Sequence, residues 1–240
     1  MVASTELTLD ILSQPDDETC GPTCLHAVYR FHGRPKPLQT LISEVTPLTT
    51  GGTLAVYLGQ HALRSGYQAF LYTFNLDVFD PTWFDDPDID LEERLEARAR
   101  ARPGGRLATA AAAYREFVRL GGVVRFEELM PDIIRRHLQD GQPILTGLSA
   151  TYLYGCAREK AVGSRLEYDD INGDPTGHFV VVHGYDPSSD SVLVADPLRE
   201  NPRGAQSYRV GVLRLLGAIM LGVLTYDGNM LVLIPPEEAQ

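Results

Sequence analysis

Apolar residues recur with two different periods along this chain, and the two periods predict both helices and strands. Between Cys20 and Phe31 they are spaced by three and four positions, which is typical of a helix that buries one face. Polar and apolar residues alternate from Thr5 to Leu12, as they do in a strand with one buried side. The same reasoning predicts helices over residues 38–44, 54–64, 91–102, 107–120, 131–138 and 212–220 and strands over residues 67–74, 123–126, 143–148, 207–210 and 230–234.

Residues 75–122 differ from the rest of this pattern and are interpreted as an insertion. Asp-Pro and Pro-Gly pairs interrupt the stretch. Its first helix has few apolar residues but pairs Glu96 with Arg100, a spacing that stabilises a solvated helix. An exposed excursion without a direct role, a lid and a protein-docking hairpin all fit this pattern. Because 240 residues with 44% hydrophobic content suffice for one or two cores, we expect a single domain over residues 1–240 that carries this insertion.

The stretch from His178 to Pro197 predicts a hairpin of two strands rich in branched residues. Side chains alternate along a strand, so a turn centred on Pro187 or Ser188 places Asp196 directly or diagonally opposite His178, on the same face. A carboxylate beside an imidazole fixes its tautomer and stabilises the imidazolium, which a cysteine nucleophile needs in its base. His178 and Asp196 are therefore candidates for the base and its orienting group.

Cys20 is placed where a cysteine becomes a nucleophile. It falls in the first turn of its predicted helix, where the helix dipole and unpaired backbone N–H groups favour the thiolate. Cys24 lies one turn further along the apolar face and is interpreted as a buried structural residue. The side-chain amide of Gln14 has the reach to point an N–H at a developing oxyanion beside the backbone N–H of Cys20. Cys20 and Gln14 are therefore candidates for the nucleophile and the oxyanion-hole donor.

Acidic residues crowd the polar segment that precedes His178. They predict a negative rim around the cleft, and such a rim concentrates ligands that carry Lys, Arg or a free amine. A solvated turn without a role in binding explains the same composition. The four candidate substrate-binding residues are Glu167, Asp169, Asp170 and Asp174.

Charge and cysteine content limit the partners and the compartment. The formal net charge of −11 argues against nucleic acid or an anionic membrane as a partner. The three cysteines cannot all pair with one another, which favours a reducing compartment. No apolar run reaches the roughly 18 residues that span a bilayer, and the first residues lack the basic start and apolar core of a signal peptide. We therefore expect no membrane insertion, and a cytoplasmic protein or one exported without a conventional signal.

Taken together, these motifs resemble a known family. In order along the chain they are Gln14, Cys20-Gly-Pro-x-Cys, Gly-His178-Phe-Val-Val-Val-x-Gly-Tyr-Asp and Val-Ala-Asp196-Pro. They are similar to the papain-like cysteine peptidases of the bacteriocin-processing (double-glycine leader) class. The resemblance implies an α+β papain-like fold, in which a helical part with the N-terminal nucleophile helix packs on an antiparallel sheet. It also implies that Cys20 is the nucleophile, His178 the general base and acid, Asp196 the orienting residue and Gln14 the oxyanion-hole donor.

The predicted reaction is hydrolysis of a peptide or amide bond through an acyl-enzyme on Cys20, with no metal or organic cofactor. Its substrate is a peptide, a protein or a small amide. Amide-group transfer and glutamine deamidation use the same Cys-His-Asp chemistry and stay open. A non-catalytic peptide-binding module is disfavoured by the intact set of four residues. A metal site from Cys20, Cys24 and His183 is disfavoured because it has no Cys-x-x-Cys spacing and alternation turns His183 away from His178.

Overall fold

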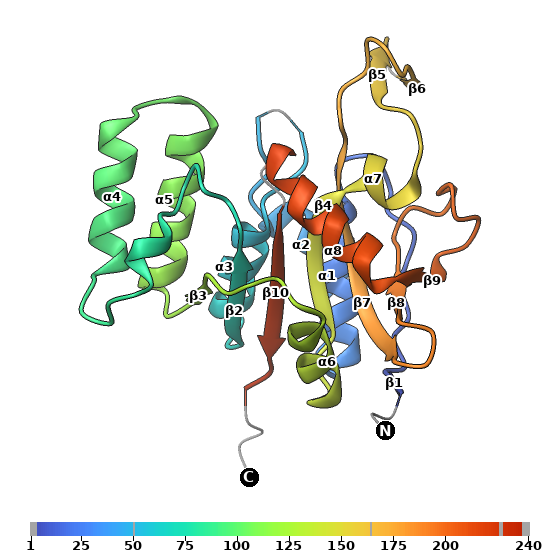
Figure 1. The fold of residues 1–240 in the computed structure, drawn as a ribbon, viewed down its shortest axis with the longest axis horizontal. Coiled ribbons are helices and arrows are strands. Elements are labelled where there is room, and N and C mark those ends of the chain that lie inside the picture. The colour runs from blue at the N-terminus through green and yellow to red at the C-terminus, as the bar shows by residue number, and fades with distance from the viewer. Residues whose placement is uncertain (1–3, 50, 164, 226–227, 237–240) are drawn as a thin grey trace.

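A mixed β-sheet forms the centre of the molecule in the computed structural model, which describes residues 4–49, 51–163, 165–225 and 228–236 (Figure 1). Within these residues the sheet consists of β1 (Thr5–Glu6), β2 (Gln68–Thr73), β3 (Val123–Arg125), β4 (Ile144–Ser149), β7 (Gly177–Asp186), β8 (Ser191–Ala195), β9 (Ser207–Gly211) and β10 (Asn229–Ile234). The strand order is β3-β2-β10-β4-β7-β8-β9, and β1 pairs with β7. Neighbouring strands are antiparallel except β2 and β3, which run parallel, so the predicted antiparallel sheet has one parallel edge.

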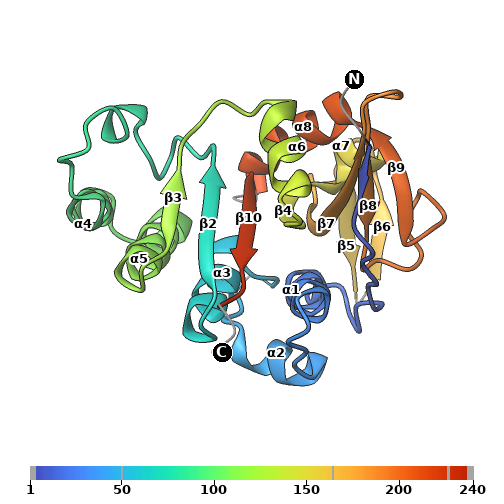
Figure 2. The ribbon, with the colours of Figure 1, turned by 90° about the horizontal axis from the view of Figure 1, so that it is seen from below.

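Helices cover both faces of this sheet (Figure 2). On one face lie α1 (Cys20–Phe31), α2 (Leu38–Glu44) and α3 (Ala55–Arg64), and on the other lie α6 (Pro131–Gln139), α7 (Ala150–Tyr154) and α8 (Val212–Leu221). The other helices are α4 (Leu91–Ala101), α5 (Gly105–Arg119) and the short 3₁₀ turns η1 (Pro81–Trp83) and η2 (Gly222–Thr225). In the described part of the chain, no helix is both long and apolar enough to cross a membrane.

Side-chain alternation divides each central strand between two hydrophobic cores. In β10, Leu231 and Leu233 pack with α1 and α3, whereas Met230 and Val232 pack with α6 and α8. All four side chains are buried. Because both faces are covered, β10 is a continuous apolar run from Met230 to Ile234 in the sequence.

The first strand is shorter than the alternating pattern predicted. Exposure alternates from residue 4 to residue 12, but only Thr5–Glu6 joins the sheet as β1. The reason is competition for one edge of β7. Strand β4 occupies that edge as far as Val182, so β1 can pair only beyond it, at Gly184 and Tyr185.

The polar segment that precedes His178, over residues 155–177, contains a second, two-stranded sheet. Its strands, β5 (Glu159–Val162) and β6 (Arg165–Tyr168), form an antiparallel hairpin that stands out from the main sheet (Figure 1). Lys160 lies opposite Glu167, an oppositely charged cross-strand pair. The hairpin is solvated on most of its surface, so its sequence lacks the alternation that predicts a half-buried strand.

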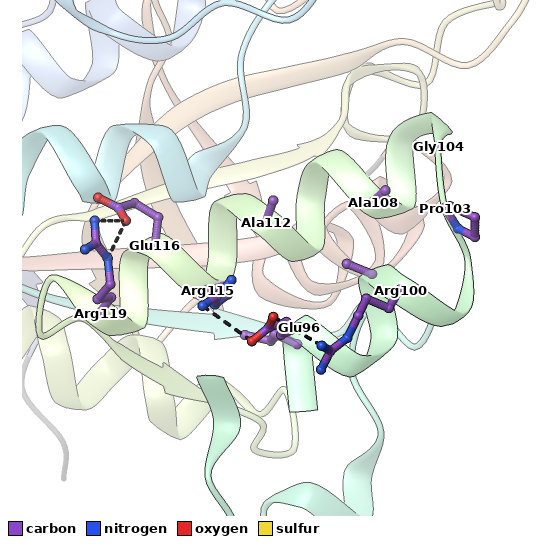
Figure 3. Close-up of a pocket in the computed structure, with 11 residues that line it drawn as sticks. Glu96, Arg100, Pro103, Gly104, Ala108, Ala112, Arg115, Glu116 and Arg119 are labelled. Carbon is purple, nitrogen blue, oxygen red and sulfur yellow. Dashed lines mark hydrogen bonds and ion pairs between the residues drawn. The ribbon is translucent and has the colours of Figure 1, made fainter. Parts of the chain in front are cut away.

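Helices α4 and α5 form a hairpin beside the β3 edge of the sheet (Figure 1). Phe117 of α5 is fully buried in the same core as α1 and α3, whereas α4 is largely exposed apart from Leu95. Glu96 and Arg100 form the predicted i, i+4 ion pair at 3.5 Å, and Arg115 of α5 bonds to Glu96 at 3.4 Å. Through Phe117, helix α5 ties this hairpin to the main core. A cavity of about 630 Å³ lies between the two helices (Figure 3).

Candidate active site

An irregularity in the pairing of β7 with β8 decides which side chains share a face. The register shifts by one residue between Val182 and Gly184, so His183 is an extra residue, a β-bulge. Beyond the bulge, Asp196 lies diagonally across from His178 on the same face of the hairpin. With the observed turn and no bulge, Asp196 would lie on the opposite face.

His178 and Asp196 form the buried centre of the site. His178 Nε2 lies 2.9 Å from Asp196 Oδ1, and the two residues are 6% and 0% exposed. Burial lowers the pKa of His178, but hydrogen bonds with Asp196 and Cys20 outweigh burial and raise that pKa to about 10. Burial raises the pKa of Asp196, and the hydrogen bond with His178 reverses this effect, so the pKa lies below its ordinary value. At neutral pH the pair is therefore an imidazolium beside a carboxylate.

Asp196 has three further hydrogen-bond donors that the sequence did not reveal. The hydroxyls of Tyr154 and Tyr208 each donate to Asp196 Oδ2 at 2.8 Å. The backbone N–H of Leu198 donates to Oδ1 at 2.9 Å. No motif connects the two tyrosines with Asp196 along the chain, because they stand 42 and 12 positions away in sequence.

Cys20 is the first residue of α1 and faces the imidazole. Its side chain hydrogen-bonds with His178, and because Asp196 occupies Nε2 of the ring, Nδ1 is the nitrogen left for the sulfur. A residue in the first turn of a helix has no intrahelical acceptor for its backbone N–H, so that group is available to a ligand. Cys20 is 8% exposed and forms part of the wall of a cavity of about 930 Å³. The thiol is thus more enclosed than its place in the sequence suggests, and it borders this cavity.

The other candidate thiols and the second histidine have structural partners. Cys24 is fully buried, its sulfur donates to the carbonyl of Phe179 at 3.3 Å, and burial raises the pKa of its thiol. Burial also raises the pKa of Cys156. His183 Nδ1 hydrogen-bonds with the carbonyl of Leu7 at 2.8 Å, which links the bulge to the N-terminal segment. Among the described residues, no three His, Cys, Asp or Glu side chains gather in a way that could hold a metal ion.

Gln14 ties the segment before α1 to the segment after Asp196. Its backbone N–H donates to the carbonyl of Pro197 at 2.9 Å, and its side-chain Nε2 donates to the carbonyl of Asp16 at 2.8 Å. A side-chain amide nitrogen carries two hydrogens, so one hydrogen of Gln14 is left after the bond to Asp16.

Of the four acidic residues predicted to bind substrate, Asp174 lines the cavity beside Cys20. The cavity wall also includes Glu159, Asp17 and Glu18, together with Arg106 from the start of α5. Asp17 and Glu18 belong to the polar run just before Cys20. Glu159 is brought to the wall by pairing with Asp174 across an isolated β-bridge, a long-range contact that spacing does not predict. The acidic rim is therefore built partly from other residues than those predicted.

The remaining three acidic residues are not among those that line the cavity. Glu167 lies opposite Lys160 in the β5–β6 hairpin. Asp169 Oδ1 accepts hydrogen bonds from the backbone N–H groups of Asn172 and Ile171, and these bonds help to lower its pKa to about 2. The carbonyl of Asp170 accepts a hydrogen bond from Arg158. The contacts of these residues shape the hairpin and its turn.

The fold that carries this site is the α+β fold of papain-like cysteine peptidases. A structure described as a putative C39-like peptidase from Bacillus anthracis matches with a TM-score of 0.51 at 14% identity, over 97% of this chain and 98% of that one. Residues 103–213, which include His178 and Asp196, match the model of the Peptidase_C39 like family. The resemblance to these peptidases that the sequence motifs implied is thereby confirmed.

Two other solved structures are similar at lower TM-scores. The peptidase domain of Streptococcus ComA, a bi-functional ABC transporter involved in a quorum sensing pathway, has a TM-score of 0.44 at 15% identity and covers 94% of this chain and 97% of that one. Xylellain, a cysteine protease from Xylella fastidiosa, has a TM-score of 0.44 at 15% identity and covers 97% of this chain and 85% of that one. No curated protein sequence matches the chain.

Proposed function

We propose that this protein is a cysteine peptidase that hydrolyses peptide bonds through an acyl-enzyme on Cys20. The observation that carries the proposal is the hydrogen-bonded series of Cys20, His178 and Asp196 beside a cavity of about 930 Å³. A nucleophile hydrogen-bonded to a base, with the base oriented by a third group, is the arrangement that covalent catalysis requires. The match to a peptidase family supports the same chemistry.

In the proposed reaction, the Cys20 thiolate attacks the carbonyl carbon of the scissile bond while His178 holds the proton as imidazolium. As the C–S bond forms, the carbonyl electrons move onto oxygen, and the backbone N–H of Cys20 and the side-chain amide of Gln14 donate to that oxyanion. The oxyanion collapses, the C–N bond breaks and the leaving amine takes the proton from His178. A water molecule then gives a proton to His178 and attacks the thioester, which releases the carboxylic acid and restores the thiolate.

Alkylation of the three cysteines tests the nucleophile directly. At pH 6 we expect iodoacetamide to modify Cys20 about tenfold faster than Cys156, because the start of a helix and the neighbouring imidazole of His178 activate this thiol as a nucleophile. Mass spectrometry of the digested protein measures each rate. His178→Ala should slow modification of Cys20 and leave Cys156 unchanged. Equal rates at all three cysteines in the wild type would overturn the assignment.

The same variants separate peptide hydrolysis from the other reactions of a thiol. Incubation of wild type with a peptide library should yield fragment pairs with a new carboxylate and a new amine, and Cys20→Ala should yield none. Products that carry a new amide, or glutamate in place of glutamine, would instead show transfer or deamidation.

We propose further that residues 1–240 form a single domain in which the α4–α5 hairpin is an insertion. The burial of Phe117 in the core that also contains Cys24 and Leu58 supports this proposal. Helix α5 also brings Arg106 to the wall of the cavity beside Cys20, so the hairpin contributes to the surface that a substrate meets. A cytoplasmic location stays a prediction from the sequence.

For the substrate, we propose a peptide with a basic residue near the scissile bond. Four acidic side chains line the cavity beside Cys20, namely Asp17, Glu18, Glu159 and Asp174, against one arginine among the lining residues, Arg106. A cleft with an excess of one charge concentrates ligands of the opposite charge. The predicted preference for basic substrates thus rests on the acidic residues that line the cavity wall.

A further inference from the structure

Two tyrosine hydroxyls bind the oxygen of Asp196 that faces away from His178. Tyr154 is the last residue of α7 and Tyr208 lies in β9, and each donates to Oδ2 at 2.8 Å. The other oxygen, Oδ1, is 2.9 Å from His178 Nε2 and also 2.9 Å from the backbone nitrogen of Leu198. Each carboxylate oxygen therefore takes part in two hydrogen bonds, which come from four different segments of the chain.

This arrangement limits the rotation of the Asp196 carboxylate. Two donors from separate elements hold Oδ2, so Oδ1 stays directed at the ring of His178. Asp196 is 0% exposed, so these donors, and not bulk water, surround its carboxylate. A buried carboxylate is stable as an anion only when donors compensate for the lost hydration.

The phenols themselves are held in the protonated form by their surroundings. Burial, and then the charge of Asp196, raise the pKa of both Tyr154 and Tyr208 well above the ordinary value. Four other titratable or charged groups act on Asp196 and the two tyrosines. His178 acts on Asp196, and Cys24 acts on Asp196 and Tyr208. Cys20 acts on Tyr154, and Arg203 acts on Tyr208. In the described part of the chain, the side chains that donate hydrogen bonds to the Asp196 carboxylate are those of Tyr154, Tyr208 and His178.

We propose that Tyr154 and Tyr208 are positioning residues of the active site, which keep Asp196 ionised and aimed at His178 and so maintain the reactivity of Cys20 at mildly acidic pH. The inference rests on the proposed function, because it assigns the tyrosines a role in activating the proposed nucleophile. Neither tyrosine is among the residues that line the cavity beside Cys20, so both act through Asp196 and not on the substrate.

The test is the pH dependence of Cys20 alkylation in Tyr154→Phe, Tyr208→Phe and the double variant. Phenylalanine keeps the ring and removes only the hydroxyl. We expect the acid-side midpoint of the rate to move up when either hydroxyl is removed and to move further in the double variant, because each hydroxyl holds the carboxylate on which the imidazolium depends. Tyr72→Phe is the matched control, since the Tyr72 hydroxyl is also bonded to a histidine, His137, but lies outside the site. Its midpoint should equal that of the wild type.

A second background separates positioning from a general loss of packing. In an Asp196→Asn protein, removal of either hydroxyl should leave the midpoint where it is, and thermal melting shows which variants are folded. A shift that persists without the carboxylate, or an unchanged midpoint in the folded double variant, would overturn the inference. A wild type whose Cys20 reacts no faster than Cys156 would instead overturn the proposed function.

Discussion

Cys20 and Cys24 lie one turn apart on α1, and their surroundings give them different chemistry. The Cys24 thiol is fully buried and donates to a backbone carbonyl. Cys20 has the unpaired N–H groups of the helix start on one side and the imidazole of His178 on the other. The position of each cysteine in the helix can be read from the sequence, so the sequence suffices to single out Cys20 as the proposed nucleophile. The hydrogen bonds of Tyr154 and Tyr208 with Asp196 could not be predicted, because local spacing does not indicate contacts between distant segments of the chain.

The stability of the protein should depend on pH through His178. Its pKa is about 10 in the folded protein against an ordinary value of 6.5. A raised pKa means that the stabilisation is fully present below about pH 6.5 and is lost as pH rises through about 10. Asp196 acts in the opposite direction, because its lowered pKa gives a stabilisation that is lost in acid.

Urea unfolding of wild type and His178→Gln from pH 6 to 11 measures this contribution. The difference in the free energy of unfolding between the two proteins should fall by on the order of 5 kcal/mol across the alkaline limb. Titration of tyrosines and lysines is common to both proteins and cancels in the difference. A difference that is constant with pH would contradict the raised pKa of His178.

The β7–β8 hairpin shows how far strand reasoning reaches. Its two strands and the shared face of His178 and Asp196 were predicted from alternation with a turn centred on Pro187 or Ser188. The observed pairing of Asp186 with Ser191 centres the turn half a residue later, which alone would separate the two side chains. The bulge at residue 183 restores the shared face. The prediction of the face was right, because the pairing beyond the bulge, of Val181 with Ala195, is the register that a turn centred on Ser188 gives. The bulge itself was not predicted, since a bulge is set by contacts beyond the hairpin.

Those contacts give His183 a structural role that can be tested. His183→Ala removes the hydrogen bond to the carbonyl of Leu7 and a buried ring, so we expect a loss of about 2 kcal/mol of stability. The rate of Cys20 alkylation should stay within about twofold of the wild type, because His183 takes no part in the proposed activation of the Cys20 thiol. His178→Ala should instead slow alkylation of Cys20 strongly in a protein that melting shows to be folded. If His183→Ala stopped alkylation in a folded protein, the bulge would be part of the site.

The order of strands in the sheet was beyond what the sequence could predict. Strand β10, near the end of the chain, pairs with β2 on one side and β4 on the other. Local patterns identified each of these strands but not their neighbours, because pairing depends on contacts between residues far apart in the chain. The candidate site depends on the same long-range contacts, because Cys20 comes from a helix on one face of the sheet and His178 from a strand within it (Figure 2).

The distribution of charge over the molecule leads to the last prediction. The chain carries a formal net charge of −11, and acidic side chains also line the cavity beside Cys20. We expect Asp174→Asn to lower kcat/KM for peptides with Lys or Arg near the scissile bond by about threefold at low salt, and to have less effect at high salt, where exposed charges are screened. Glu167→Gln is the matched control, because it removes the same charge from the neighbouring hairpin without touching the cavity wall. Both variants change the net charge equally, so equal losses of kcat/KM would mean that the overall electrostatic field of the protein selects the substrate. No loss in either variant would contradict the proposal that the acidic cavity wall selects basic substrates.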